Sequence, residues 1–119
     1  MCLHIIVLPR ILYTKKIGDY MNFDTISASK IDEYFNDNNV IIIDVRNHYD
    51  YSQGHIPTAI NIPYNEFHEV KRSLPRNKTL ILYCERGGTS IILARDLCKE
   101  GYIVKNIYGG INAYRGPLE

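Results

Sequence analysis

The chain has 119 residues, of which 45% are hydrophobic and 23% are charged, and its formal net charge is +1. This length fits one globular domain with a core of its own and is too short for two. A net charge so close to zero gives no reason to expect a nucleic acid or an acidic membrane surface as a partner. The composition therefore predicts a single globular domain with neither partner.

Three cysteines are present, at positions 2, 84 and 98. They have no disulfide-framework spacing, no Cys-x-x-Cys pair, and no histidines at the spacing of a zinc site, so no metal is expected. An odd, sparse set of cysteines favours a reducing, cytoplasmic setting. Cys98 lies beside the apolar stripe of its predicted helix, and we expect it to be a small packing residue rather than a second redox partner.

Residues 1–20 differ from the rest of the chain. The apolar stretch 3–12 is interrupted by histidine, proline and arginine, so it is too short to span a bilayer. Lysines follow this stretch instead of preceding it, and no small-residue cleavage site is visible, which argues against a signal peptide. We expect residues 1–20 to be an extension and 21–119 to be the domain; the alternative is an added strand or helix docked on it.

The first half of the domain alternates short apolar runs with helical signals. A strand is predicted at 23–26, and Ser29 with Asp32 three residues later resembles a capping box that opens a helix at 29–35. The β-branched run at 40–43 predicts a strand covered on both faces. A helical turn at 49–53 and a strand at 59–62 follow.

The second half continues this alternation. A helix at 64–73, a strand at 79–83, a helix at 90–100, a strand at 103–107 and a last helix at 110–114 are predicted. In the helix at 90–100, small and apolar residues recur at helical spacing, and Gly101 follows as a C-terminal cap. The pattern predicts an α/β fold with a mostly parallel five-stranded sheet and helices on both faces.

The stretch Cys84–Ser90 lies between a predicted strand and a predicted helix. A glycine-bearing turn before a helix N-terminus can direct several backbone N–H groups at one point, and the helix end adds partial positive charge. Both effects favour the thiolate form of Cys84 over the thiol. The thiolate is the form of cysteine that acts as a nucleophile. An inert buried cysteine is the alternative. Asp44 and Arg46 also follow a strand end, the edge where such sheets bind ligands.

The loop Cys84-Glu85-Arg86-Gly87-Gly88-Thr89-Ser90 resembles the active-site loop of the rhodanese (thiosulfate sulfurtransferase) family, in which a cysteine opens the loop. Three further stretches agree in order and spacing: Ile43-Asp44-Val45-Arg46, the segment 54–63 with Gly-His-Ile-Pro, and the segment 108–114 with Tyr-Gly-Gly-Ile-Asn-Ala-Tyr. Together they span 24–116. The resemblance implies a single rhodanese-like domain.

The resemblance also implies an activity. The Cys84 thiolate would take the outer sulfur of thiosulfate, forming a persulfide and releasing sulfite, and a thiol, cyanide or a partner protein would then accept the sulfur. Loop amides would stabilise the anionic sulfur. No metal and no organic cofactor is implied. The expected partners are a small-molecule sulfur donor and such an acceptor.

The remaining loop residues are considered for a role in substrate binding and for a purely structural role. Arg86 is expected to pair with the sulfonate of the donor rather than to be a solvated charge. Thr89 stands where many single-domain members resemble each other in having arginine, which makes Arg86 the expected anion contact. Gly87 and Gly88 are expected to serve unusual φ angles or close approach of a ligand. Ser90 is either the helix N-cap or a hydroxyl that faces the sulfur.

Four further charged or titratable residues belong to this interpretation, and they have different expected roles. Glu85 would oppose the thiolate unless its side chain points to solvent. Asp44 and Arg46 are expected to form a pair that supports the loop rather than to bind substrate. His55 is expected to be a turn residue rather than a general base for Cys84.

Two alternative functions differ in class. A cysteine phosphatase needs an arginine six residues after the nucleophile, and Ser90 occupies that place. A non-enzymatic persulfide carrier or binding module that serves a partner protein has the same loop as a sulfurtransferase. Turnover of thiosulfate by the isolated protein distinguishes the carrier from the enzyme.

Overall fold

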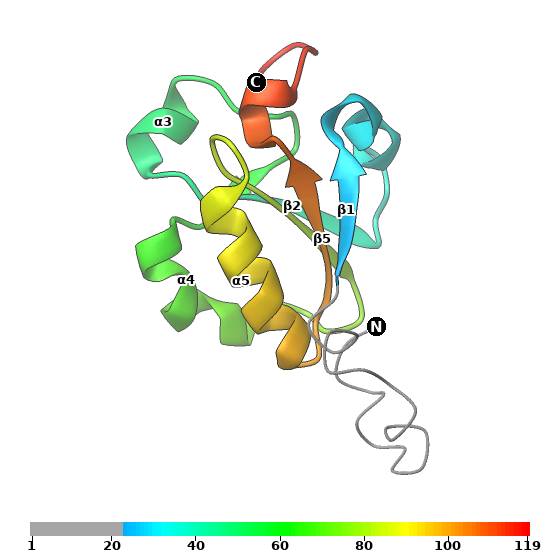
Figure 1. Ribbon diagram of the computed structural model, residues 1–119, viewed down its shortest axis with the longest axis vertical. Coiled ribbons are helices and arrows are strands. Elements are labelled where there is room, and N and C mark those ends of the chain that lie inside the picture. Colours follow the sequence, from blue (N-terminus) through cyan, green and yellow to red (C-terminus); the bar gives the residue numbers. More distant parts are fainter. Residues whose placement is uncertain (1–22) are drawn as a thin grey trace.

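The computed structural model describes residues 23–119, so the expected extension at 1–20 and Cys2 lie outside the described residues. One parallel sheet organises this part of the chain (Figure 1). Its strands, in the spatial order β1-β5-β4-β2-β3, are β1 (Asp24–Ser27), β5 (Ile103–Tyr108), β4 (Thr79–Tyr83), β2 (Val40–Asp44) and β3 (Ile60–Asn61). The predicted α/β fold with a five-stranded sheet is confirmed.

Helices cover both faces of the sheet, as expected. They are α3 (His48–Ser52), α4 (Tyr64–Val70), α5 (Gly88–Lys99) and the 3-10 helices η2 (Ala28–Tyr34), η3 (Lys71–Ser73) and η4 (Gly110–Ala113). Helices α4 and α5 pack together on one face, while η2 contributes to the core of the other face (Figure 1).

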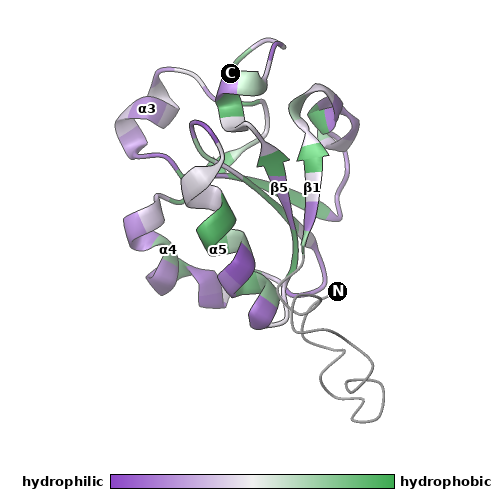
Figure 2. Cartoon of the chain, in the orientation of Figure 1, coloured by the Kyte–Doolittle hydropathy of each residue, from purple (hydrophilic) through white to green (hydrophobic). Residues whose placement is uncertain are grey.

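The alternation of side chains along the central strands builds a core on each face. In β4, Leu80 and Leu82 face α4 and α5, whereas Ile81 and Tyr83 face η2. All four side chains are fully buried. The hydrophobic residues of β1, β5 and the first half of α5 are visible as green segments in Figure 2, in contrast to the hydrophilic α3. Burial on both faces explains why the central strands β2 and β4 are nearly continuous apolar runs.

The local start of η2 differs from the prediction. The helix begins directly after β1, and the Ser27 side chain accepts a hydrogen bond from the Ser29 N–H at 3.4 Å. The capping box assigned to Ser29 and Asp32 is therefore wrong, because Ser27 already supplies the capping oxygen. The helix predicted at 64–73 is present, but its last turn tightens into η3.

The strand order positions the residues that follow β2 and β4. These strands are neighbours, with Asp44 opposite Tyr83, and the ladder continues with a hydrogen bond from the Val45 N–H to the Tyr83 carbonyl at 2.9 Å. Because parallel strands end at the same edge, the segment after Asp44 meets the segment that begins at Cys84. No helix in the part of the chain described by the structure has the length and apolar character to cross a membrane.

Asn106 is a buried polar residue on β5 whose side-chain oxygen and nitrogen both lack a hydrogen-bond partner. Leaving such a group unsatisfied costs about 1–3 kcal/mol. Replacing Asn106 with Val, a residue that favours strands, is therefore expected to raise the free energy of unfolding by a similar amount. Denaturant unfolding measures it. The exposed Asn77→Val change is the control, and a midpoint that does not rise in the Asn106 variant contradicts the prediction.

Candidate active site

Three hydrogen bonds converge on the Cys84 sulfur at the end of β4. The Gly87 N–H donates to Sγ at 3.0 Å, and the Ser90 N–H and hydroxyl each donate at 3.4 Å. Cys84 is only 6% exposed. Such donors are placed to hydrogen-bond a sulfur atom that carries negative charge.

The turn that aims these donors depends on Gly87. Its φ is +101°, and a side chain there would also place a Cβ atom 3.4 Å from the Gly109 nitrogen. Gly88 differs, because it has no positive φ and a Cβ would meet nothing within 4 Å. The expectation of an unusual φ thus holds for Gly87 and is wrong for Gly88. For Gly88, the predicted close approach of a ligand stays a prediction.

Ser90 lies inside the first turn of α5, because Gly87 occupies the N-cap position. Its side chain is fully buried, and its hydroxyl is 3.4 Å from the Cys84 sulfur and 3.3 Å from the Gly87 carbonyl oxygen. Of the two roles considered for Ser90, the structure therefore gives the hydroxyl that faces the sulfur and not the helix cap.

Helix η4 holds the backbone of the loop from the other side. The Ile111 N–H donates to the Cys84 carbonyl at 2.9 Å, and the Asn112 N–H donates to the Glu85 carbonyl at 3.0 Å. Gly110 permits this contact, since a Cβ there would collide with the backbone oxygens of Cys84 and Glu85. Sequence reasoning gave these residues no role, although the tandem Gly109-Gly110 was a signal that two backbone segments approach closely.

Asp44 and Arg46 form a pair behind the loop. Fully buried Asp44 accepts from Arg46 Nη2 at 2.7 Å, and Arg46 Nη2 also donates to the Gly54 carbonyl at 2.7 Å. Arg46 Nη1 lies 3.7 Å from Glu85 Oε1. Burial alone would lower the pKa of Arg46, but the hydrogen bond and the charge of Asp44 outweigh it, so the pKa is raised. Arg46 therefore links the end of β2, the turn at Gly54 and the loop as a permanent cation.

Tyr83, the last residue of β4, is fully buried, and the Arg46 guanidinium lies over its ring. Its hydroxyl accepts from the Ile56 N–H at 3.0 Å. Burial, followed by the negative charge of Asp44, raises the pKa of Tyr83 far above its usual range. Tyr83 therefore stays neutral and contributes structure rather than charge.

A cavity of about 420 Å³ lies next to the sulfur. It is lined by residues from the segment after β2 and from the loop: Val45, Arg46, Asn47, Asp50, Cys84, Glu85, Arg86, Gly88 and Thr89. Val45, Asn47 and Asp50 were missed from the sequence, although they directly follow a predicted strand end. The side chain of Asn47 accepts from the Asp50 N–H at 2.8 Å, which starts α3 and brings both residues to the cavity.

His55 is not among the residues that line this cavity. Its ring stacks on Tyr51 with 3.8 Å between the ring centroids, and its Nε2 lies 3.7 Å from Glu119 Oε1. His55 therefore lies in the segment between α3 and β3 and not at the cavity, which agrees with the expected structural role and not with a general base for Cys84.

The family model of the rhodanese-like domain matches residues 27–116. This chain belongs to the rhodanese-like domain family. A tRNA sulfurtransferase from Desulfurococcus amylolyticus is 36% identical over 118 residues, which cover 91% of this chain and 23% of the relative. A tRNA uridine(34) hydroxylase from Buchnera aphidicola subsp. Baizongia pistaciae is 34% identical over 108 residues, which cover 82% of this chain and 32% of the relative. The chain thus spans about a third or less of these relatives.

Solved structures agree with this assignment. A rhodanese-related protein from Thermoplasma volcanium matches with a TM-score of 0.75 and 26% identity, covering 82% of this chain and 98% of that one. The Bacillus anthracis protein CoADR-RHD matches with a TM-score of 0.73 and 33% identity, covering 88% of this chain and 19% of that one.

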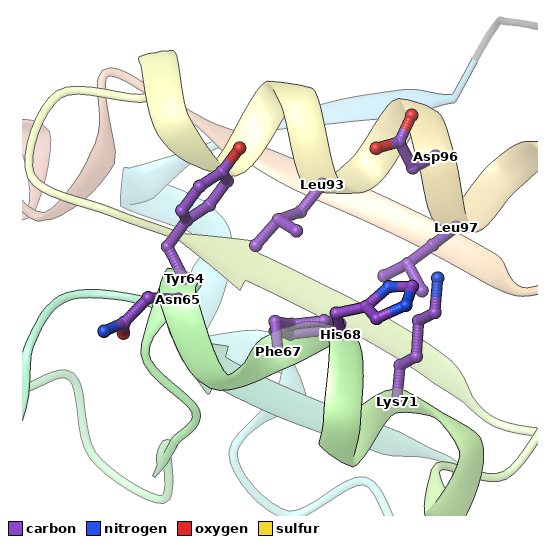
Figure 3. Close-up of a pocket in the computed structure, with 8 residues that line it drawn as sticks. All are labelled: Tyr64, Asn65, Phe67, His68, Lys71, Leu93, Asp96 and Leu97. Atoms are coloured by element: carbon purple, nitrogen blue, oxygen red, sulfur yellow. The ribbon is translucent and has the colours of Figure 1, made fainter.

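The rhodanese-like domain has a second hollow, of about 300 Å³, between α4 and α5. Side chains from both helices border it in Figure 3, with Phe67, Leu93 and Leu97 forming its apolar part. None of the predicted site residues lines this hollow. Cys98 is fully buried on α5. Within residues 23–119, no group of three or more His, Cys, Asp or Glu side chains is placed to hold a metal ion.

Two glycines of the rhodanese-like domain make a matched pair for a stability test. Gly110→Ala places a Cβ against the loop carbonyls at a φ of +63° and is expected to destabilise the domain by more than about 1 kcal/mol. Gly88→Ala meets no neighbour within 4 Å and is expected to change stability by less than about 0.5 kcal/mol. Denaturant unfolding compares them, and equal losses would show that η4 does not hold the loop.

Proposed function

We propose that the domain is a sulfurtransferase that carries a sulfane sulfur as a Cys84 persulfide. The observation that supports this most is the convergence of the Gly87 and Ser90 donors on Sγ at 3.0–3.4 Å. A persulfide is also an anion, with its charge one atom further from the protein. The same donors and the adjoining cavity therefore suit the sulfur both before and after it is loaded.

Both half-reactions are displacements at sulfur. The Cys84 thiolate attacks the outer sulfur of thiosulfate, a new S–S bond forms, and the old S–S bond breaks as its electron pair leaves with sulfite. An acceptor such as cyanide or a thiolate then attacks the outer sulfur of the persulfide, and Cys84 leaves as the thiolate. The cysteine is regenerated, as two-step covalent catalysis requires.

We propose thiosulfate as a donor because Arg86 lines the cavity. Of the two arginines there, Arg46 is already bonded to Asp44 and to the Gly54 carbonyl. Arg86 is therefore the arginine available for the sulfonate oxygens of the donor. Thr89, also at the cavity, brings no further cation.

The acceptor is a separate part of the proposal. The relatives named tRNA sulfurtransferase and tRNA uridine(34) hydroxylase carry tRNA in their names. Net charge alone therefore does not exclude a nucleic-acid partner, contrary to the expectation from composition. We propose that sulfur from Cys84 serves tRNA modification, in the cytoplasm, with RNA binding supplied by other protein parts. In that arrangement the domain alone could act as a carrier, the second candidate function.

The phosphatase alternative has less support. The position where a cysteine phosphatase needs an arginine is Ser90, whose side chain is fully buried and bonded to Sγ. A hydroxyl there supplies a hydrogen bond to the sulfur but no positive charge for phosphoryl oxygens. Sulfur chemistry is therefore the better match to the loop.

Incubation with thiosulfate is expected to add one sulfur atom to Cys84, because its thiolate is the nucleophile in the proposal. Intact-mass measurement followed by peptide mapping locates the adduct, and cyanide should remove it as thiocyanate. The Cys84→Ser variant is the control. An adduct that persists in this variant, or that maps to Cys98, contradicts the assignment. A protein that loads but does not turn over unaided is a carrier.

Replacing Arg86 with Ala is expected to weaken the use of thiosulfate by about 1.5–3 kcal/mol, the worth of a hydrogen bond to a charged group. This corresponds to roughly a 10- to 100-fold loss in kcat/KM. Transfer from the loaded persulfide to a small neutral thiol is expected to change much less, because that step involves no sulfonate.

Stopped-flow measurement of the two half-reactions separates these effects. Arg95→Ala is the control, because it removes an exposed arginine on α5 that does not line the cavity. Equal losses in both half-reactions of the Arg86 variant would mean that Arg86 holds the loop or the thiolate and does not bind the donor.

A further inference from the structure

We propose that Asn112 is a positioning residue that sets the charge presented to the Cys84 sulfur by holding Glu85 and Arg86 in fixed directions. Asn112 lies on η4 between these two oppositely charged loop side chains. In the amide orientation that satisfies both neighbours, its nitrogen donates to Glu85 Oε2 at 3.1 Å and its oxygen accepts from Arg86 Nε at 3.3 Å. The proposal deepens the proposed function and rests on it for the nature of the donor.

The first consequence concerns the carboxylate next to the nucleophile. The Glu85 side chain is 55% exposed, and its Oε1 lies 3.7 Å from Arg46 Nη1 while Oε2 faces Asn112. The Glu85 carboxylate is thus held between an amide and a cation. If it left these partners and moved closer to the Cys84 sulfur, its charge would repel both the thiolate and an anionic donor more strongly.

The second consequence concerns the cation. The hydrogen bond to Asn112 uses Nε of Arg86, which leaves both Nη groups of the guanidinium for the cavity that Arg86 lines. A guanidinium is planar, so fixing Nε restricts the plane in which the remaining donors lie. Asn112 therefore limits the directions in which Arg86 can meet an anion.

The role is separable from support of the loop backbone. The bonds that hold the loop come from backbone groups, with the Asn112 N–H donating to the Glu85 carbonyl and the Ile111 N–H donating to the Cys84 carbonyl. Neither hydrogen bond uses the side chain of Asn112, and Asn112 is an exposed residue. An amide offers a donor to Glu85 and an acceptor to Arg86 at once, whereas Leu offers neither and Asp offers no donor.

Alkylation of Cys84 tests the positioning role of Asn112 without any sulfur donor. The full chain is treated with iodoacetate, an anion, and with neutral iodoacetamide, and peptide mapping follows Cys84 alone. The ratio of the two rates reports the charge near the sulfur. In Asn112→Leu we expect the ratio to fall about 2- to 5-fold, as for charge interactions at partly exposed sites. Asn112→Asp should lower it further, and the rate with iodoacetamide should change less.

A rescue distinguishes charge from shape. Adding Glu85→Gln to Asn112→Leu removes the released carboxylate and is expected to restore most of the ratio, a coupling that a double-mutant cycle measures. Asn65→Leu is the matched control, because Asn65 is an exposed asparagine on α4 that points away from α5 in Figure 3. Thermal unfolding of each variant shows whether the fold is kept.

Two results would overturn the proposal. One is an unchanged iodoacetate-to-iodoacetamide ratio in Asn112→Leu. The other is an equal slowing of both reagents together with a lower melting temperature, which is the behaviour of a purely structural residue. Because alkylation needs no thiosulfate, a protein that never forms a persulfide still tests Asn112, so failure of the proposed function and failure of this proposal are distinguishable.

Discussion

The proposed chemistry depends on keeping a negative charge on a sulfur that is only 6% exposed. Burial alone favours the neutral thiol, so the hydrogen bonds from Gly87 and Ser90 must offset the loss of water. These donors reach Sγ only if the chain turns sharply after β4 and starts α5 at once. The positive φ of Gly87 provides that turn. The order of strand, loop and helix is therefore a condition of the chemistry as well as of the fold.

A short loop cannot hold this conformation by itself, and its supports come from distant parts of the sequence. The carbonyls of Cys84 and Glu85 accept from η4, while Arg46 reaches the loop from the end of β2. These segments meet because β4 lies between β5 and β2 in the sheet. A change in strand order would leave the loop sequence intact and remove its supports.

This dependence explains what the sequence could predict. The limits of β4 were predicted because 79–83 is an uninterrupted apolar run, and the candidate nucleophile followed from its place between that strand and a helix. Strand order, by contrast, leaves no local pattern, because runs buried on both faces look alike. Asp50 and Asn112 were missed for the same reason: their neighbours are set by the sheet. The start of η2 was misplaced because Ser27 and Ser29 both suit a cap, and only the end of β1 decides between them.

The charges around the cavity indicate that orientation matters here more than net charge. Arg46 and Arg86 line it together with Asp50 and Glu85, so its ionised side chains balance. Asp44, which does not line the cavity, already forms an ion pair with Arg46. An anion would therefore gain little from the average field and much from a guanidinium and amides aimed at it. In the proposed function, a chain with a net charge of +1 recognises an anionic donor through the few side chains that keep these groups in place. The preference of such a site for one sulfur donor over another changes when one of those side chains is replaced, while the sheet beneath the site stays the same.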